Sequence, residues 1–167
     1  SFFNLVETNF RNGIGLGLSY SDSNFKGFKD KVASIGISYP HNNPFHNFGV
    51  SYSFGKIGDE NYKLISVQGQ YRFASVLSVG ALLQFSMLGD DKETQNILNI
   101  AYELSEFRSL LGRAVIKDGK LNWYLAFKQS GNFGAEYYLI IGNPNADRFS
   151  ERFVLKVVYP LEVVRKN

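Results

Sequence analysis

The side chains best suited to chemistry are two histidines, His41 and His46, at the turn PHNNP of residues 40–44. A histidine within hydrogen-bond reach of a serine could support nucleophilic hydrolysis. The chain has no nucleophile motif such as G-x-S-x-G. Two histidines without a carboxylate partner fall short of the three or four ligands of a typical metal site. We therefore expect no catalytic residue, no enzyme activity, no metal and no cofactor.

A second set of polar side chains alternates with apolar residues inside predicted strands, so its members share one face of a sheet. Along a lumen, they would line a solute path and bias it by charge. Paired with one another, they would instead hold a wall together, and both interpretations stay open. These pore-lining candidates are Gln68, Gln70, Arg72, Gln84, Glu103, Arg113, Lys128, Lys156 and Glu162.

Two further groups of residues do not predict a binding site. Asp90, Asp91 and Glu93 form an acidic segment whose spacing is not that of a calcium loop, and we interpret it as solvated. Gly15 and Gly17 are followed by no helix, so they lack the context of a phosphate-binding loop.

The elements that position these residues are strands, and the longest pattern spans residues 62–88. Apolar and polar residues alternate along 65–73 and again along 77–87, with a turn near Ala74 and Ser75 and with Leu82 as the single misfit. A period of two over this length indicates strands and not helices. Tilted strands of about 9–11 residues are long enough to span a bilayer.

The same alternation continues along most of the chain. It predicts strands at 14–21, 33–39, 48–54, 98–104, 107–116, 121–127, 133–142 and 153–163, and a hairpin turn of Asp-Gly type at 117–120. Residues 1–10 alternate poorly. We therefore divide the chain into an N-terminal segment, 1–13, that is a partial strand or a plug, a β-barrel, 14–164, and a tail, 165–167.

Composition narrows the class further. The chain has 167 residues, no cysteine, and a net charge of +3 that is too small to argue for nucleic acid. No apolar run approaches the ~18 residues of a transmembrane helix. Aromatic residues make up 16% of the chain, with 16 glycines, which favours an all-β protein rich in turns.

The connections also alternate in predicted length. Those near 11–13, 40–44, 74–75, 105–106 and 130–132 are short, while those at 22–31, 56–61, 89–94 and 143–150 are longer and more charged. This pattern, over roughly residues 13–164, resembles the general class of bacterial outer-membrane β-barrels. The resemblance implies an antiparallel up-and-down transmembrane β-barrel, here of about 10–12 strands.

The alternative is a soluble β-barrel that binds an apolar ligand in its interior. Two features favour the membrane: the apolar faces carry no charge, and the opposite faces are mostly Gly, Ser, Asn and Gln. A third is the position of aromatic residues near strand ends, where membrane-interface residues lie. They include Tyr20, Tyr39, Phe54, Tyr71, Phe73, Phe85, Trp123 and Phe127.

The sequence thus predicts a protein of the bacterial outer membrane. We expect a narrow pore, or the membrane-embedded part of a transport, export or assembly system, in the C-terminal portion of a larger protein. The expected partners are the lipid bilayer with its lipopolysaccharide and other envelope proteins, and not nucleic acid.

Overall fold

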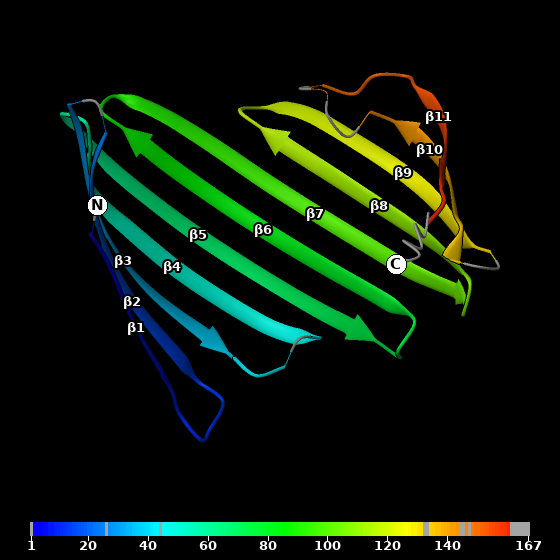
Figure 1. Ribbon diagram of the computed structural model, residues 1–167, viewed down its shortest axis with the longest axis horizontal. Coiled ribbons are helices and arrows are strands. Elements are labelled where there is room, and N and C mark those ends of the chain that lie inside the picture. The colour runs from blue at the N-terminus through cyan, green and yellow to red at the C-terminus, as the bar shows by residue number, and fades with distance from the viewer. Residues whose placement is uncertain are drawn as a thin grey trace, which may run out of the picture.

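A computed structural model describes residues 2–25, 27–43, 45–131, 134–143, 146 and 148–160 as one antiparallel sheet (Figure 1). Each of its 11 strands pairs with the strands before and after it in sequence, so the all-β up-and-down prediction is confirmed. The strands are β1 (Phe2–Asn9), β2 (Gly15–Phe25), β3 (Phe28–Tyr39), β4 (His46–Ile57), β5 (Glu60–Phe73), β6 (Leu77–Leu88), β7 (Asp91–Ser105), β8 (Arg108–Lys117), β9 (Lys120–Ser130), β10 (Glu136–Gly142) and β11 (Phe153–Val158).

The predicted tight turns are confirmed by backbone geometry. Ala74 and Ser75 have φ values of 45° and 61°, and Asp118 and Gly119 have 48° and 76°. Two consecutive positive φ values are typical of the turn that matches the right-handed twist of a β-hairpin. These turns therefore fix the registers of β5 with β6 and of β8 with β9.

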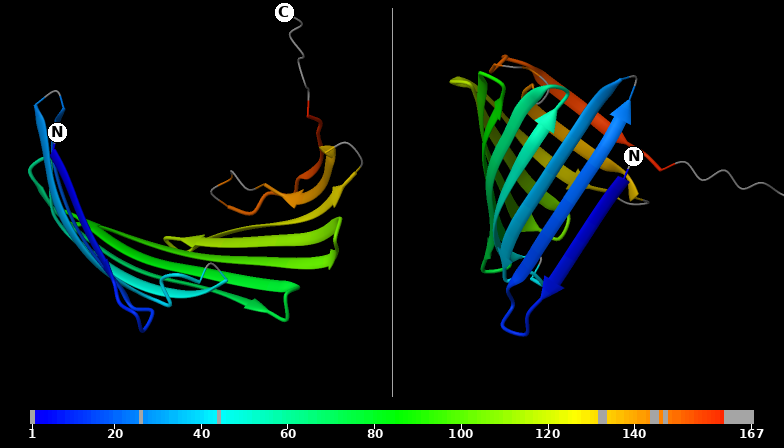
Figure 2. Two further views of the ribbon diagram at one scale, coloured as in Figure 1. Left: turned by 60° about the horizontal axis from the view of Figure 1, so that its bottom comes forward. Right: turned by 90° about the vertical axis from the view of Figure 1, so that its left-hand side faces the viewer.

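The prediction of a closed barrel is wrong for the described residues: the sheet is a curved trough with two free edges, β1 and β11 (Figure 2). The strand count excludes one form of closure. Because every neighbouring pair is antiparallel and the number of strands is odd, β1 and β11 run in the same direction. They therefore cannot pair with each other in the antiparallel manner of the rest of the sheet.

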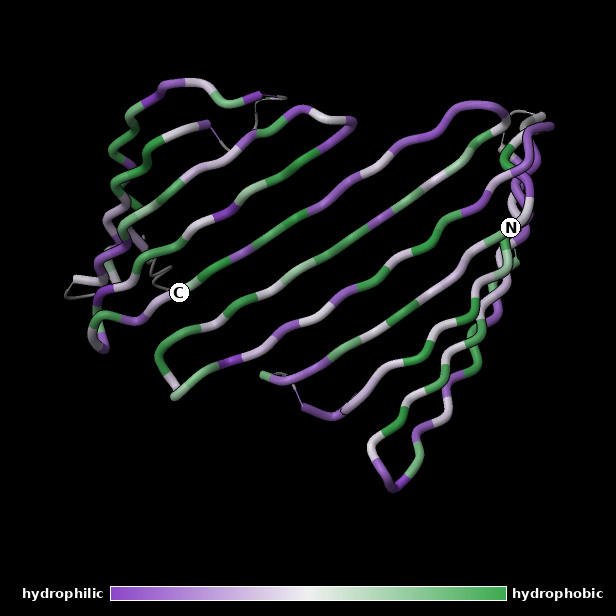
Figure 3. The backbone as a smooth tube through the Cα atoms, turned by 180° about the vertical axis from the view of Figure 1, so that it is seen from behind, coloured by the Kyte–Doolittle hydropathy of each residue, from purple (hydrophilic) through white to green (hydrophobic). Residues whose placement is uncertain are grey.

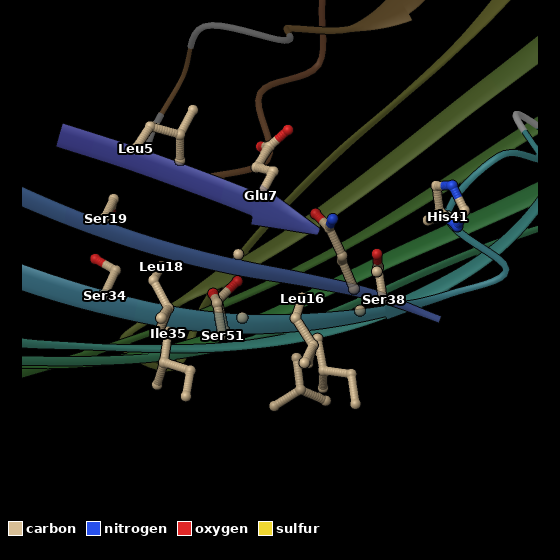
Figure 4. A pocket seen from close by; sticks show the side chains of 18 of the residues that line it. Leu5, Glu7, Leu16, Leu18, Ser19, Ser34, Ile35, Ser38, His41 and Ser51 are labelled. Carbon is tan, nitrogen blue, oxygen red and sulfur yellow. The ribbon is translucent and has the colours of Figure 1, made fainter. Parts of the chain in front are cut away.

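The sheet has a polar concave face and an apolar convex face. Ser34, Ser38 and Ser51 point into the hollow of the trough, whereas Leu16 and Leu18 point away from it (Figure 4). The strand register carries this division across the sheet, because residues directly opposite each other share a face. The alternation is visible along the tube in Figure 3. On this register, the outward face includes Leu83, Phe85 and Trp123.

The predicted difference in loop length is wrong for three of the four longer loops, whereas the connection between β10 and β11 is long, at 143–152. Residues 22–31, 56–61 and 89–94 are not long loops, because the flanking strands continue to 25, 57 and 88 and resume at 28, 60 and 91. Their polar residues pair across strands: Lys31 lies 3.4 Å from Asp22, and Asp30 accepts a 2.9 Å hydrogen bond from the Gly58 amide. Cross-strand pairing of this kind stabilises a charged strand end that resembles a loop in sequence.

The two ends of the sheet differ in how many charged residues they carry. We call the end with the connections 26–27, 58–59, 89–90, 118–119 and 143–152 the charged end, and the opposite one the turn end. Hydrophilic residues gather at the hairpins of the charged end (Figure 3).

The described residues enclose almost no core. Their buried apolar side chains are Ile97, Ala126 and Ala135. The accessible surface is 12457 Å², whereas a compact monomer of 18.9 kDa would expose about 8,300 Å². Many large apolar side chains are exposed, and Leu18, Ile35 and Leu83 are each half exposed on the convex face. Exposed apolar surface of this extent is typical of a face that contacts another molecule or a membrane.

No helix in the described part of the chain is both long enough and apolar enough to cross a membrane.

Candidate functional site

The candidate site is the concave face, where the strands from β1 to β5 line an open hollow of about 490 Å³ (Figure 4). Its inward residues are mainly glycine and serine, and the Ser34 hydroxyl donates a 2.8 Å hydrogen bond to the Ser53 hydroxyl on the next strand. Small side chains leave the space empty, and hydroxyl groups keep it wettable. Residues that share this wall are Leu5, Glu7, Asn9, Gly15, Gly17, Ser19, Ser34, Gly36, Ser38, His41, Gly49, Ser51, Ser66 and Gln68.

Both histidine rings lie within hydrogen-bond distance of backbone carbonyl oxygens at the turn end. His41 places Nδ1 3.1 Å from the Gly13 carbonyl oxygen, and His46 places Nε2 2.9 Å from the Arg72 carbonyl oxygen. Each ring thus ties its own turn to a neighbouring strand or turn. His41 borders the hollow beside Ser38, but no hydrogen bond joins these two side chains in the described structure. The geometry of a nucleophile activated by a base is not formed.

Arg72 and Glu103, two of the predicted pore-lining residues, form a pair at the turn end. Arg72 Nη2 lies 2.8 Å from Glu103 Oε1, and Arg72 Nε donates a 2.8 Å hydrogen bond to the Ser75 carbonyl oxygen. Arg72 belongs to β5 and Glu103 to β7, so the pair reaches across the end of β6. It therefore links β5, β7 and the 74–76 turn.

Lys128 and Lys156, two more of these residues, meet around Tyr138 on the concave face of β9, β10 and β11. Lys128 forms an ion pair with Glu136, whose other oxygen accepts a 2.7 Å hydrogen bond from the Tyr138 hydroxyl. Both ammonium groups lie over the Tyr138 ring, 5.7 Å and 5.5 Å from its centre. A cation at this distance is attracted by the ring face. The cluster carries two cations and one carboxylate.

Glu136 and Tyr138 were missed in the sequence, because the segment 133–142 looked apolar on both faces. The sequence did contain an indication: Glu136 and Tyr138 are two residues apart in one strand, so they share a face, and that face also carries Lys128 and Lys156. This indication could not be used without the register between β9, β10 and β11, because a tyrosine such as Tyr138 fits an apolar face as well as a polar one.

The other predicted pore-lining residues are dispersed. Gln68, Gln70 and Gln84 lie on the concave face of β5 and β6. Arg113 lies between Asn99 and Tyr124 in β8, and its Nε atom is buried without a hydrogen-bond partner among the described residues. Glu162 lies outside the described residues, so the structure does not place it.

The concave face of β9 is closed by the segment that follows β10. Asn122 is buried, and its Nδ2 donates hydrogen bonds of 2.9 Å and 2.6 Å to the Asn143 and Ala146 carbonyl oxygens. On the convex side, Phe149 stacks on Trp123 with ring centres 4.5 Å apart. The connection 143–152 is thus anchored to β9 on both sides.

The aromatic residues predicted for a membrane interface all lie on the convex face, in two groups. Tyr20, Phe54, Phe85 and Trp123 lie toward the charged end, and Tyr39, Tyr71, Phe73 and Phe127 lie toward the turn end. On β5, the outward residues Lys63 and Phe73 bracket this zone. Ten residues at ~3.3 Å each, tilted by ~45°, give a height of about 23 Å. This is close to the ~25 Å apolar band of transmembrane barrels.

The acidic segment is divided between a hairpin and a strand. Asp90 lies in the connection, Asp91 begins β7, and Glu93 lies 3.3 Å from the Lys117 ammonium. The described residues contain no group of three or more side chains placed to hold a metal ion.

Comparisons with family models, with curated proteins and with solved structures each found no match to this chain.

Proposed function

We propose that this chain is the membrane-embedded wall of a bacterial outer-membrane β-barrel that forms a pore, or the membrane part of a transport or export system. The observation that carries the proposal is the continuous apolar convex face, half exposed along its length and bracketed by two groups of aromatic residues. Lipid is the covering that suits such a face, because hydrocarbon solvates apolar side chains without cost.

The concave face supports a polar path. Its serine, glycine and glutamine side chains make a wall that water can wet, with the Arg72–Glu103 and Lys128–Glu136 ion pairs at the turn end. Charges on such a wall bias which ions and solutes pass. A soluble barrel with an apolar ligand would need the opposite arrangement, with the large apolar side chains inside.

The two free edges imply further strands. Since β1 and β11 run in the same direction, an antiparallel closure needs an odd number of additional strands, and a single one would give 12. Even numbers are the rule for bacterial barrels of one chain. A longer protein would supply those strands and cover the unpaired backbone groups of both edges.

Trp123 offers a direct test, because it is the only tryptophan and it faces outward. After refolding into lipid vesicles, we expect its emission to shift to the blue and to be quenched by lipids brominated near the headgroup. In cells, the protein should fractionate with the detergent-extracted envelope. The proposal would be overturned by a protein that stays folded and monodisperse without detergent. In such a protein, the fluorescence of Trp123 would be quenched by a water-soluble quencher and not by brominated lipid.

A further inference from the structure

A second hollow, of about 530 Å³, lies on the convex face near the charged end, over β3 to β6. Its side chains combine three lysines, Lys31, Lys56 and Lys63, with three large apolar groups, Tyr52, Phe54 and Met87. Lys63 lies directly between Phe54 on β4 and Met87 on β6, so cationic and apolar groups alternate in one site.

The lysines of this hollow are poorly neutralised. Lys31 and Lys56 lie directly opposite each other on adjacent strands, an arrangement that is destabilising for like charges. Lys31 has Asp22 at 3.4 Å, but Lys56 and Lys63 have no carboxylate within 4.0 Å among the described residues. An anion in the hollow would offset the repulsion.

Two other acids near this end belong to the opposite face. Asp30 is engaged by the Gly58 amide, and Glu60 lies against Gly89. Both have the parity of the concave face, on the far side of the sheet from the three lysines. On the convex face, Lys31, Lys56 and Lys63 therefore share this end with Asp22, which pairs with Lys31 alone.

An apolar groove continues from the hollow along the convex face. Tyr52 and Phe54 stack with ring centres 5.5 Å apart, and Phe54 also borders a neighbouring hollow of about 360 Å³. That second hollow is lined by Val6, Leu18, Tyr20, Ala33 and Ile35. A ligand that fits both hollows has an anionic head and a hydrocarbon tail.

We propose that Lys31, Lys56 and Lys63 bind the phosphate-bearing headgroup of an anionic membrane lipid, with an acyl chain in the groove beside Phe54. This rests on the proposed function, in which the convex face contacts lipid. Basic residues at the level of the headgroups attract anionic lipids, and their long side chains reach phosphate while their methylene groups stay in the apolar zone. The hollow would hold one such lipid more tightly than the rest of the belt does.

The test uses the full protein in zwitterionic detergent, with native mass spectrometry to count retained lipid. Phosphatidylglycerol and phosphatidylcholine of the same acyl chains are added separately. We expect phosphatidylglycerol to bind about tenfold or more tightly than phosphatidylcholine, and the double variant K56Q/K63Q to lose that preference.

The double variant K117Q/K120Q is the matched control, because these two lysines also lie opposite each other at the charged end but on β8 and β9. It removes the same charge and should keep the preference. Equal binding of the two lipids by the unmodified protein, or an unchanged preference in K56Q/K63Q, would overturn the lipid site. Displacement of the lipid by inorganic phosphate alone would also overturn it, since the site would then be one for a free anion.

Failure of this site and failure of the proposed function are distinguishable. A protein that inserts into vesicles without preferring phosphatidylglycerol retains its role as a membrane wall and loses only the lipid site. A protein that does not enter detergent or vesicles at all loses both.

Discussion

The concave faces of the two halves of the sheet differ, although their convex faces are alike. From β2 to β5, the inward residues are mostly glycine and serine, and they leave a hollow of about 490 Å³. From β8 to β10, the inward residues include Leu111, Val115, Tyr124, Tyr138 and Ile140. The second half fills its own concave side, and a segment of chain covers part of it through Asn122.

This difference indicates where a solute path would run. Bulky inward side chains and ion pairs occupy the concave side of β8 to β10, whereas small side chains leave the concave side of β2 to β5 open. Since narrow barrels are filled by their own side chains, an opening depends on where those side chains are small. We therefore expect the passage to follow β2 to β5. Four predictions test this comparison.

The largest effect should be the same in both halves, because it concerns the convex face. Leu83→Arg in β6 and Leu125→Arg in β9 each place a charge in the middle of the apolar zone. Each should lower the free energy of unfolding from lipid vesicles by about 2–4 kcal/mol. Urea titration followed by Trp123 fluorescence measures this. A neutral effect in either half would mean that the face there does not contact lipid.

The next effect should separate the halves. Ala126 on the concave face of β9 is 3% exposed, so Ala126→Phe should overpack the wall and cost about 1–3 kcal/mol. Ser51→Phe, at a concave position of β4, enters the hollow and should change stability by no more than about 0.5 kcal/mol. Instead it should reduce conductance in a planar bilayer. Equal losses of stability would remove the distinction between the two walls.

A smaller effect concerns the segment that covers β9. Asn122→Ala removes the donor to two carbonyl oxygens and should cost about 1–2 kcal/mol. Ser34→Ala removes a single hydroxyl bond in the open wall and should cost less. Hydrogen exchange provides the specific readout: protection at residues 143–152 should fall in the first variant only.

The smallest effect should differ in sign between two arginines. Arg113 has a buried Nε without a hydrogen-bond partner in the described structure, so Arg113→Met should leave stability unchanged or raise it by up to about 1 kcal/mol. Arg72→Met loses the pair with Glu103 and should cost about 0.2–1 kcal/mol. A clear loss in Arg113→Met would reveal a partner beyond the residues described.

Much of the local structure could be predicted from the sequence. Strict alternation around Ile65–Phe73 and Leu77–Met87 places side chains on two faces, because successive residues of a pleated strand point in opposite directions. The Asp-Gly turn at 117–120 could be predicted for the same local reason, since it needs two positive φ values. Charged strand ends such as Asp22 and Lys31 could not, because the pairing that stabilises them depends on the register between β2 and β3.

The sequence predicted which residues share the face that forms the candidate site, but not which of them are in contact. Gln68, Gln84 and Arg113 could be assigned to one side by parity, but their partners depend on the register between strands. Arg72 meets Glu103 across an intervening strand, and Lys128 meets Lys156 through Tyr138. Neither relation is visible in a linear pattern.

The sequence by itself determined that this chain forms β-strands with one apolar and one polar face, because the two-residue period belongs to each strand alone. Only the tertiary structure decided which face is convex, how far the strands run into the charged end, and that the sheet stays open. Curvature and closure depend on how strands pair at the edges, and β1 and β11 run in the same direction.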